Sequence, residues 1–246
     1  MPTPTLRLTN AATKKNIADI EVQISAAETA LAKLTTSREE DFQKWLTEGR
    51  AKLAENRDAV KIGSLVPGQI QHLHFEDHKG GANASVEGKV GKAVRLSGDD
   101  GIGLKVGNFR RFDPFSISLW LQTPDLKERA VVFHRSRAWT DAGSRGYELL
   151  LENGHLSFAL IQFDPGNSIR VRSAEPIPVG KWQHFTITYD GSSRANGIQL
   201  YLNGLPAKQT TVRDTLYKNI TGGGGDNITI GERFRDRGFS RGLVDE

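Results

Sequence analysis

Two segments of the sequence, 134–146 and 232–241, are rich in arginine. The candidate ligand-binding side chains in them are Arg135, Arg137, Trp139, Asp141, Arg145, Arg233, Arg235 and Arg237. A guanidinium group can bind a carboxylate through two parallel hydrogen bonds, and an exposed indole offers a flat apolar surface for stacking. We expect the two segments to lie close together and to recognise an acidic polysaccharide or a protein partner. The alternative is an internal Arg–Asp network that holds long loops, with Trp139 as a plug.

Carboxylate spacing argues against catalysis. A retaining glycosidase needs two carboxylates about 5 Å apart. Glu148 and Glu152 have the spacing of one strand face, but Glu152 opens a turn, and the adjacent Glu76 and Asp77 would point to opposite faces. No Gly-x-Ser-x-Gly elbow is present. We therefore predict a non-catalytic protein.

Three histidines lie close together in the sequence. His72, His74 and His78 are spaced two and four residues apart. On a strand His72 and His74 share a face, which would allow a metal site. The alternative is a pair of exposed or partly buried histidines on an edge strand.

Composition excludes several classes of function. The chain has no cysteine, which excludes disulfides, thiolate metal sites and a cysteine nucleophile. A net charge of +4, from 33 basic and 29 acidic residues, is too small to indicate nucleic-acid binding. No apolar run approaches the roughly 18 residues that span a bilayer. The first ten residues lack the apolar segment of a signal peptide.

Residues 11–58 have the pattern of a helix. Apolar side chains recur at alternating spacings of three and four, at Ile17, Ile20, Ile24, Ala27, Leu31 and Leu34. Ser37 followed by Glu40 is a capping-box signature, so we predict a second helix from there. We expect a helical arm over 1–62. It either packs on a neighbouring domain or serves as an oligomerisation arm.

After Gly63 the pattern changes to short apolar stretches separated by turn residues. We predict strands from 70–76 to 227–231, several with period-two alternation, and hairpin turns at the Asn-Gly pairs 153–154 and 203–204. No segment of helical period separates these strands. The pattern predicts an antiparallel, mainly β sandwich over 63–246.

Four stretches of this half, in order, resemble one family. They are GKVGKAVRLSGDD (88–100), FSISLWL (115–121), VGKWQHFTITYDG (179–191) and LYLNG (200–204). Over residues 66–246 the chain resembles the laminin G-like subgroup of the concanavalin A-like lectin/glucanase superfamily. The resemblance implies a two-sheet jelly-roll sandwich that binds carbohydrate or mediates adhesion. A structural or protein–protein interaction domain in a multidomain assembly is the alternative.

The resemblance carries further expectations. Segment 134–148 is similar to a version found in large multidomain bacterial proteins, which implies an extracytoplasmic location within a larger protein. Relatives often hold a structural Ca²⁺ near the first and last strands, and Glu76, Asp99 and Asp245 are the candidate ligands here. A motif like 242–246 opens the final strand in the family, so we expect a sheet that lacks its last strand.

Overall fold

The computed structural model describes residues 10–55, 66, 68–78, 81–138 and 145–246. The chain divides into two compact units, Met1–Pro67 and Gly68–Glu246, which we describe separately. None of the helices in the described ranges combines the length and apolarity needed to cross a membrane.

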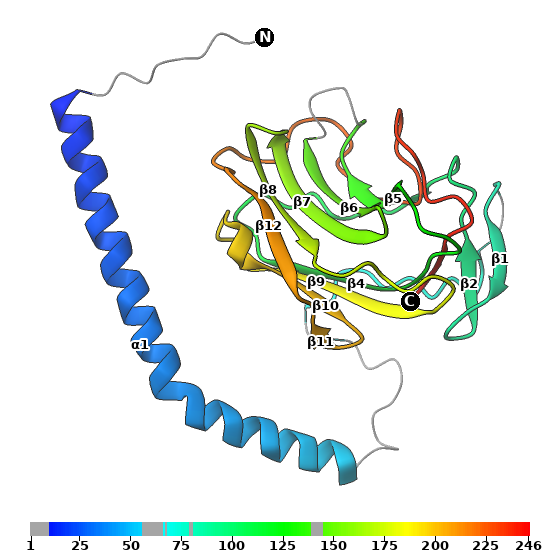
Figure 1. The fold of residues 1–246 in the computed structure, drawn as a ribbon, viewed down its shortest axis with the longest axis horizontal. Coiled ribbons are helices and arrows are strands. Elements are labelled where there is room, and N and C mark those ends of the chain that lie inside the picture. The colour runs from blue at the N-terminus through cyan, green and yellow to red at the C-terminus, as the bar shows by residue number, and fades with distance from the viewer. Residues whose placement is uncertain (1–9, 56–65, 67, 79–80, 139–144) are drawn as a thin grey trace. The chain divides into compact units, whose positions relative to one another are not determined.

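In the described part of the first unit, residues Ala11–Glu55 form a helix, α1 (Figure 1). The Asn10 side chain caps its start, because Asn10 Oδ1 accepts a hydrogen bond from the Thr13 amide at 2.8 Å. The prediction of a second helix from Ser37 is wrong: α1 continues through this position. The Ser37 hydroxyl donates instead to the Leu34 carbonyl oxygen at 2.9 Å, so its hydrogen bond is satisfied inside the helix.

The apolar seam of α1, which is the set of heptad positions predicted from the sequence, is exposed to solvent. Its exposed members include Ile17, Ile20, Ile24, Leu31 and Leu34. Pairing of this seam with another chain stays a prediction.

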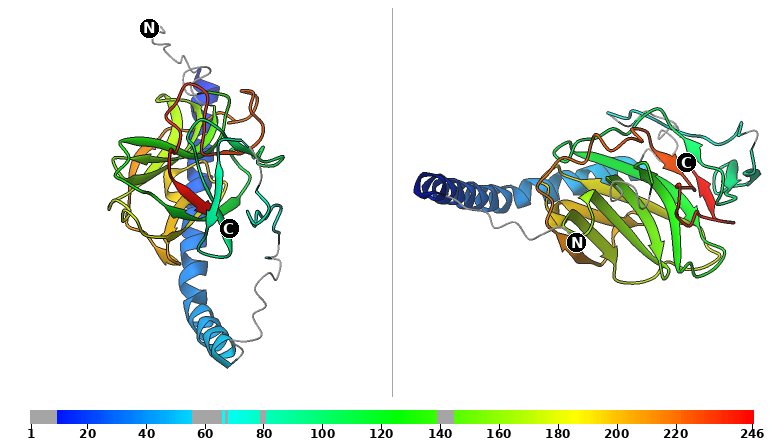
Figure 2. Two further views of the ribbon diagram at one scale, coloured as in Figure 1. Left: turned by 90° about the vertical axis from the view of Figure 1, so that its right-hand side faces the viewer. Right: turned by 90° about the horizontal axis from the view of Figure 1, so that it is seen from above.

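The second unit is a sandwich of two seven-stranded antiparallel sheets (Figures 1 and 2). Sheet A has the order β1 (Ala84–Glu87), β2 (Lys92–Arg95), β14 (Leu243–Asp245), β4 (Phe115–Gln122), β9 (Gln183–Tyr189), β10 (Ile198–Leu202) and β11 (Leu205–Pro206). Sheet B has the order β12 (Gln209–Asp214), β8 (Asn167–Ser173), β7 (His155–Phe163), β6 (Gly146–Glu152), β5 (Arg129–Arg135), β13 (Thr229–Ile230) and β3 (Ile102–Gly103). A short 3-10 helix, η2 (Ala195–Gly197), precedes β10. The predicted fold class is confirmed.

The core lies between the sheets and is centred on aromatic rings. Phe115 of β4 packs 5.2 Å from Tyr147 of β6, 6.4 Å from Phe158 of β7 and 5.6 Å from Tyr189 of β9, measured between ring centroids. Rings at such distances and tilts add to the hydrophobic stabilisation from buried area. The rings from both sheets fix the sandwich and therefore the surfaces on its outside.

The first strand differs from the prediction. Residues 69–75 form no strand, and Ala84–Glu87 forms β1 instead. Leu73 and Phe75 still pack against the core, and Phe75 has a positive φ of 55° that ends the extended run. The apolar alternation of this segment reflects side-chain burial without backbone pairing.

The last strand also differs. Leu243–Asp245 forms β14 between β2 and β4, and Val244 pairs with Val94 on one side and Leu121 on the other. Sheet A is therefore continuous at the position where we expected a missing strand.

Candidate binding surface

The two arginine-rich segments lie beside each other on sheet B. Ala138 and Phe234 form a parallel β-bridge, and the Nε2 atom of His134 lies 2.9 Å from the Glu232 carbonyl oxygen. The expectation that the segments are neighbours is confirmed for the described residues. Trp139 and Asp141 lie outside the described residues.

A buried ionic network joins these segments to the outer face of sheet B. Arg233, which is 1% exposed, forms ion pairs with Glu148 of β6 and with Asp236. Glu148 also accepts a hydrogen bond from Arg170 of β8 at 2.5 Å. Arg129 of β5 donates to both carboxylate oxygens of Asp236, at 2.7 and 3.0 Å. Three guanidinium groups thus share two buried carboxylates across three strands and one loop.

The network fixes the charge of its members. Burial raises the pKa of Glu148, but Arg233 and Arg170 more than offset this and lower it to about 2. Burial also raises the pKa of Asp236, and Arg129 and Arg233 reverse the direction, so that it lies below its ordinary value. Burial, with the nearby charge of Arg233, lowers the pKa of His134 to about 4. Glu148 is therefore ionised and His134 neutral at pH 7.

Arg135 is a further buried guanidinium, outside the network of Glu148 and Asp236. It is fully buried and donates to the Ile220 carbonyl oxygen at 2.9 Å and to the Asn108 side-chain oxygen. Arg135 and Arg233 therefore do not lie on the surface, and they have the internal role that was the alternative interpretation of these segments. Both are enclosed because the strands of sheet B that carry or face them are buried on both faces.

The other arginines of the two segments reach solvent. Arg137 and Arg235 are exposed, and the Arg235 guanidinium lies 5.1 Å from the ring centre of Phe234, which is 58% exposed. Arg237 forms an exposed ion pair with Glu128 at 2.6 Å. The partly buried Arg145 makes long hydrogen bonds, of 3.4 Å each, to two backbone carbonyl oxygens. Ligand binding by these side chains stays a prediction.

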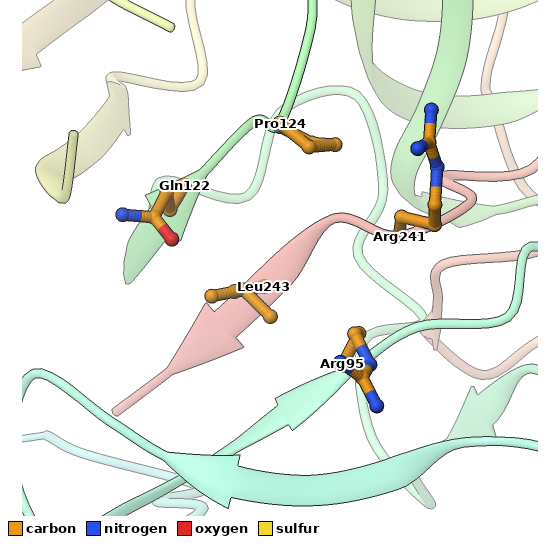
Figure 3. A pocket seen from close by; sticks show the side chains of 5 residues that line it. All are labelled: Arg95, Gln122, Pro124, Arg241 and Leu243. Carbon is orange, nitrogen blue, oxygen red and sulfur yellow. The ribbon is translucent and has the colours of Figure 1, made fainter. Parts of the chain in front are cut away.

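An open depression of about 390 Å³ lies on sheet A at the end of the second segment (Figure 3). It is lined by Arg95, Gln122, Pro124, Arg241 and Leu243. Leu243 pairs with Arg95 on one side and with Gln122 on the other, so these three form one row across β2, β14 and β4. Because neighbouring residues in register share a face, the sheet itself places Arg95 here. Arg95 and Gln122 were not among the predicted site residues, since register between distant strands cannot be read from spacing.

The three candidate calcium ligands lie at different places. Asp245 is buried, and its Oδ2 accepts hydrogen bonds from the Lys89 and Val90 amides at 2.7 and 2.9 Å. Glu76 accepts one from the Lys92 amide at 2.9 Å, and Asp99 is exposed in a turn. Within the described residues these three carboxylates do not form a convergent group of ligands. Calcium binding stays a prediction.

Comparisons with known proteins concern the fold and, separately, the sequence. Solved structures with a similar fold include domain 4 of AbnA, a GH43 extracellular arabinanase from Geobacillus stearothermophilus, in complex with arabinotriose. It is 23% identical, with a TM-score of 0.40, over 70% of this chain and 76% of that chain. The CBM40 of Ruminococcus gnavus IT-sialidase, bound to alpha2,3 sialyllactose, is 14% identical, with a TM-score of 0.44, over 62% and 88%. The botulinum neurotoxin serotype G binding domain is 15% identical, with a TM-score of 0.46, over 66% and 41%.

These likenesses concern the fold alone. No curated protein sequence matches the chain. A laminin-G-type family model, described as the concanavalin A-like lectin/glucanases superfamily, matches residues 96–246. The described sandwich, with its two antiparallel sheets, agrees with that match. The chain belongs to the concanavalin A-like lectin/glucanases superfamily.

Proposed function

We propose that the sandwich is a non-catalytic carbohydrate-binding module for an acidic polysaccharide, within a larger extracytoplasmic protein. Membership of a superfamily of lectins and glucanases supports a glycan ligand. The observation that carries the proposal is the depression on sheet A, where two guanidinium groups flank an apolar centre.

The chemistry of the depression suits a charged sugar chain. Arg95 is exposed and has no carboxylate partner among the described residues, while Arg241 pairs with the exposed Asp125 at 2.7 Å. A guanidinium fork can bind the carboxylate of an acidic sugar through two hydrogen bonds. Leu243 and Pro124 offer apolar contact, and Gln122 adds an amide. A few polar groups around an apolar floor are the usual composition of a ligand site.

The buried carboxylates favour binding over hydrolysis. A glycosidase needs one carboxylic acid that can protonate the leaving oxygen near neutral pH. Glu148 is fully buried between two arginines, and its pKa of about 2 keeps it ionised. Asp236 is held in the same way by Arg129 and Arg233. These two carboxylates therefore act within the scaffold.

A second candidate function is protein–protein interaction. The observation that favours it is the exposed apolar seam of α1. A heptad seam buries its side chains when two or more helices associate. Under this alternative the full chain forms a stable oligomer and does not bind glycans.

Binding of polygalacturonate, measured by isothermal titration calorimetry, tests the proposal. We expect the full chain to bind this acidic polymer, and to bind neutral dextran at least ~10-fold more weakly, because charge drives the contact. Raising NaCl from about 20 mM to about 500 mM should weaken the binding, since salt screens exposed charges. The double substitution Arg95→Ala and Arg241→Ala should reduce the affinity by ~10-fold or more.

The matched control is Arg213→Ala. Arg213 is an exposed arginine on β12, the edge strand of sheet B. Its substitution removes one positive charge from another face, as each of the two substitutions in the double variant does at the depression. Equal losses in the control and the double variant would contradict the site. Absence of polygalacturonate binding by the unmodified chain, together with a stable oligomer in analytical ultracentrifugation, would favour the interaction alternative.

A further inference from the structure

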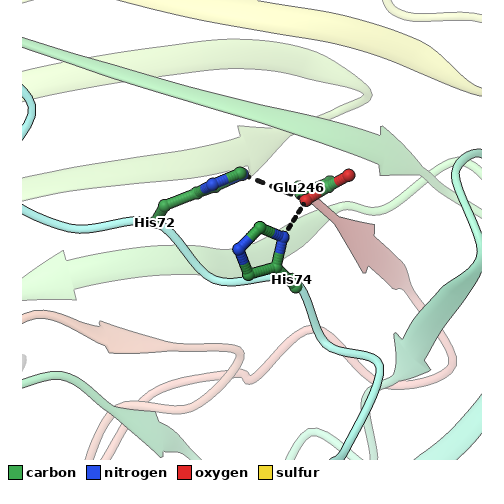
Figure 4. Close-up of side chains that lie close together, drawn as sticks. All are labelled: His72, His74 and Glu246. Atoms are coloured by element: carbon green, nitrogen blue, oxygen red, sulfur yellow. Dashed lines mark hydrogen bonds and ion pairs between the residues drawn. The ribbon is translucent and has the colours of Figure 1, made fainter. Parts of the chain in front are cut away.

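Three side chains meet on the surface beside the end of β14 (Figure 4). His72 Nε2 lies 3.0 Å and His74 Nδ1 lies 2.8 Å from the same oxygen of Glu246, Oε2. The two imidazole rings are 4.0 Å apart between centroids. One potential ligand atom from each of the three residues lies within 4.8 Å of the other two.

The local chain direction brings both histidines to one side. Leu73 packs against the core of the sandwich, and its two neighbours His72 and His74 are exposed. Where a chain runs extended, successive side chains point to opposite sides and alternate ones to the same side. The burial of Leu73 therefore turns His72 and His74 outward together, at 39% and 62% side-chain exposure.

One turn holds both parts of this cluster in place. The Lys92 amide, where the turn between β1 and β2 ends, donates a hydrogen bond to the Glu76 carboxylate at 2.9 Å. The Lys89 and Val90 amides of the same turn donate hydrogen bonds to the Asp245 carboxylate. The histidine segment and the residue before Glu246 are thus fastened to the same short stretch of backbone. This attachment keeps the three side chains together although they are far apart in the sequence.

Two imidazoles and one carboxylate are the donor set of a zinc site. Zn²⁺ prefers nitrogen and carboxylate ligands in tetrahedral geometry, with metal–ligand distances of about 2.0–2.1 Å, which puts neighbouring ligand atoms roughly 3.3 Å apart. The observed separations from the Glu246 oxygen, 2.8 and 3.0 Å, are only a few tenths of an ångström shorter. The exposed histidine side chains can move away from Glu246 by that amount. Ca²⁺ prefers six to eight oxygen ligands, so this cluster does not suit it.

We propose that His72, His74 and Glu246 bind a Zn²⁺ ion through three protein ligands, with the fourth position open to water or to a ligand from outside. The ion would join the segment before β1 to the end of β14. Because it binds the folded sandwich and not the unfolded chain, it would stabilise the fold by an amount that rises with the logarithm of its free concentration above the Kd. The site is separate from the residues of the sheet A depression.

Titration of the tag-free full chain with ZnCl₂, after removal of metal with EDTA and dialysis, tests the proposal. We expect one equivalent of Zn²⁺ to bind and the thermal midpoint to rise, with no such response to Ca²⁺ or Mg²⁺. His74→Ala and Glu246→Gln should each weaken Zn²⁺ binding by more than about 10-fold, the lower end of the loss caused by removing only an outer-shell partner. His74 is exposed and Glu246 is partly buried, with a side-chain exposure of 16%. The thermal midpoint of metal-free His74→Ala should therefore stay near that of the unmodified chain, and Glu246→Gln keeps the size of the side chain.

Two substitutions serve as matched controls. His155→Gln removes a histidine on β7, and Glu87→Gln removes an exposed carboxylate on β1 of the same sheet as β14. Both should bind Zn²⁺ like the unmodified chain. The visible spectrum of the Co²⁺ complex gives a second readout, because tetrahedral and octahedral Co²⁺ absorb differently. The proposal is overturned if Zn²⁺ does not bind, if His74→Ala and Glu246→Gln bind it unchanged, or if Co²⁺ is octahedral.

Discussion

The outer faces of the two sheets use arginine in opposite ways. On sheet B, β5 to β8 are buried on both faces, and the arginines that cross this outer face are held by Glu148 and Asp236. On sheet A, β4 and β9 alternate between buried and more exposed positions, and Arg95 reaches solvent. Arginine side chains therefore belong to the internal scaffold on sheet B and are candidates for ligand contact on sheet A.

The difference lies in desolvation. A buried charge is costly unless it is paired and hydrogen-bonded, so each guanidinium on sheet B needs a carboxylate or carbonyl oxygen. An exposed arginine keeps its hydration and needs no partner until a ligand provides one. Removing one member of the buried network on sheet B should therefore lower the free energy of unfolding by a large amount. Removing an exposed charge should change it little.

The largest expected effect is that of Glu148→Gln. The substitution keeps the size of the side chain but leaves Arg170 and Arg233 without their shared charge, and breaking a buried pair typically costs about 3–5 kcal/mol. Urea denaturation measures the free energy of unfolding. Glu87→Gln, at an exposed position of β1, is the matched control and should change it by less than ~0.5 kcal/mol. A loss below ~1 kcal/mol for Glu148→Gln would show that the network contributes little.

The second prediction concerns acid pH. His134 has its pKa lowered from 6.5 to about 4, so below pH 6.5 the unfolded chain takes up a proton that the folded chain does not. Stability should therefore fall between about pH 6.5 and 4, by up to roughly 3 kcal/mol. Glu148, lowered from 4.5 to about 2, adds a further loss as pH falls from 4.5 towards 2.

His134→Gln separates the two contributions. A general loss of packing would shift the whole curve of unfolding free energy against pH, whereas loss of the His134 proton equilibrium flattens only the window between about pH 6.5 and 4. An unchanged slope in that window would assign the acid sensitivity to other groups.

The smallest expected effect is that of Arg237→Ala. Its ion pair with Glu128 is exposed, with side-chain exposures of 64% and 77%, and pairs of this kind contribute about 0.2–1 kcal/mol. The loss should shrink further at high salt. A loss as large as that of Glu148→Gln in thermal or urea denaturation would erase the contrast between buried and exposed arginines.

The sequence by itself determined the class of the fold and its two halves. Period-two strands such as 115–121 and the Asn-Gly turns predict the sandwich because burial on one face and positive φ in tight turns are local requirements. The heptad pattern predicts the helix α1 because apolar spacings of three and four match the helical repeat, although these side chains are exposed. At 70–76 apolar and polar side chains alternate, but the backbone pairs with no other strand. The sequence therefore predicted a strand that is not there, because side-chain burial and backbone hydrogen bonding are separate properties.

Only the tertiary structure decided which charged residues are scaffold and which are surface. Arg233 and Arg235 are two residues apart in one segment, yet Arg233 lies inside the ionic network and Arg235 is exposed. Arg95 and Arg241 line one depression, and His74 and Glu246 lie 2.8 Å apart, although long stretches of sequence separate each pair. For Arg95 the physical reason is strand register, which is set by packing between distant strands and decides the face on which each side chain of a strand lies. Arg233 and Arg235 lie in a loop, where Arg235 has a positive φ of 61° and no strand alternation fixes the direction of the side chains.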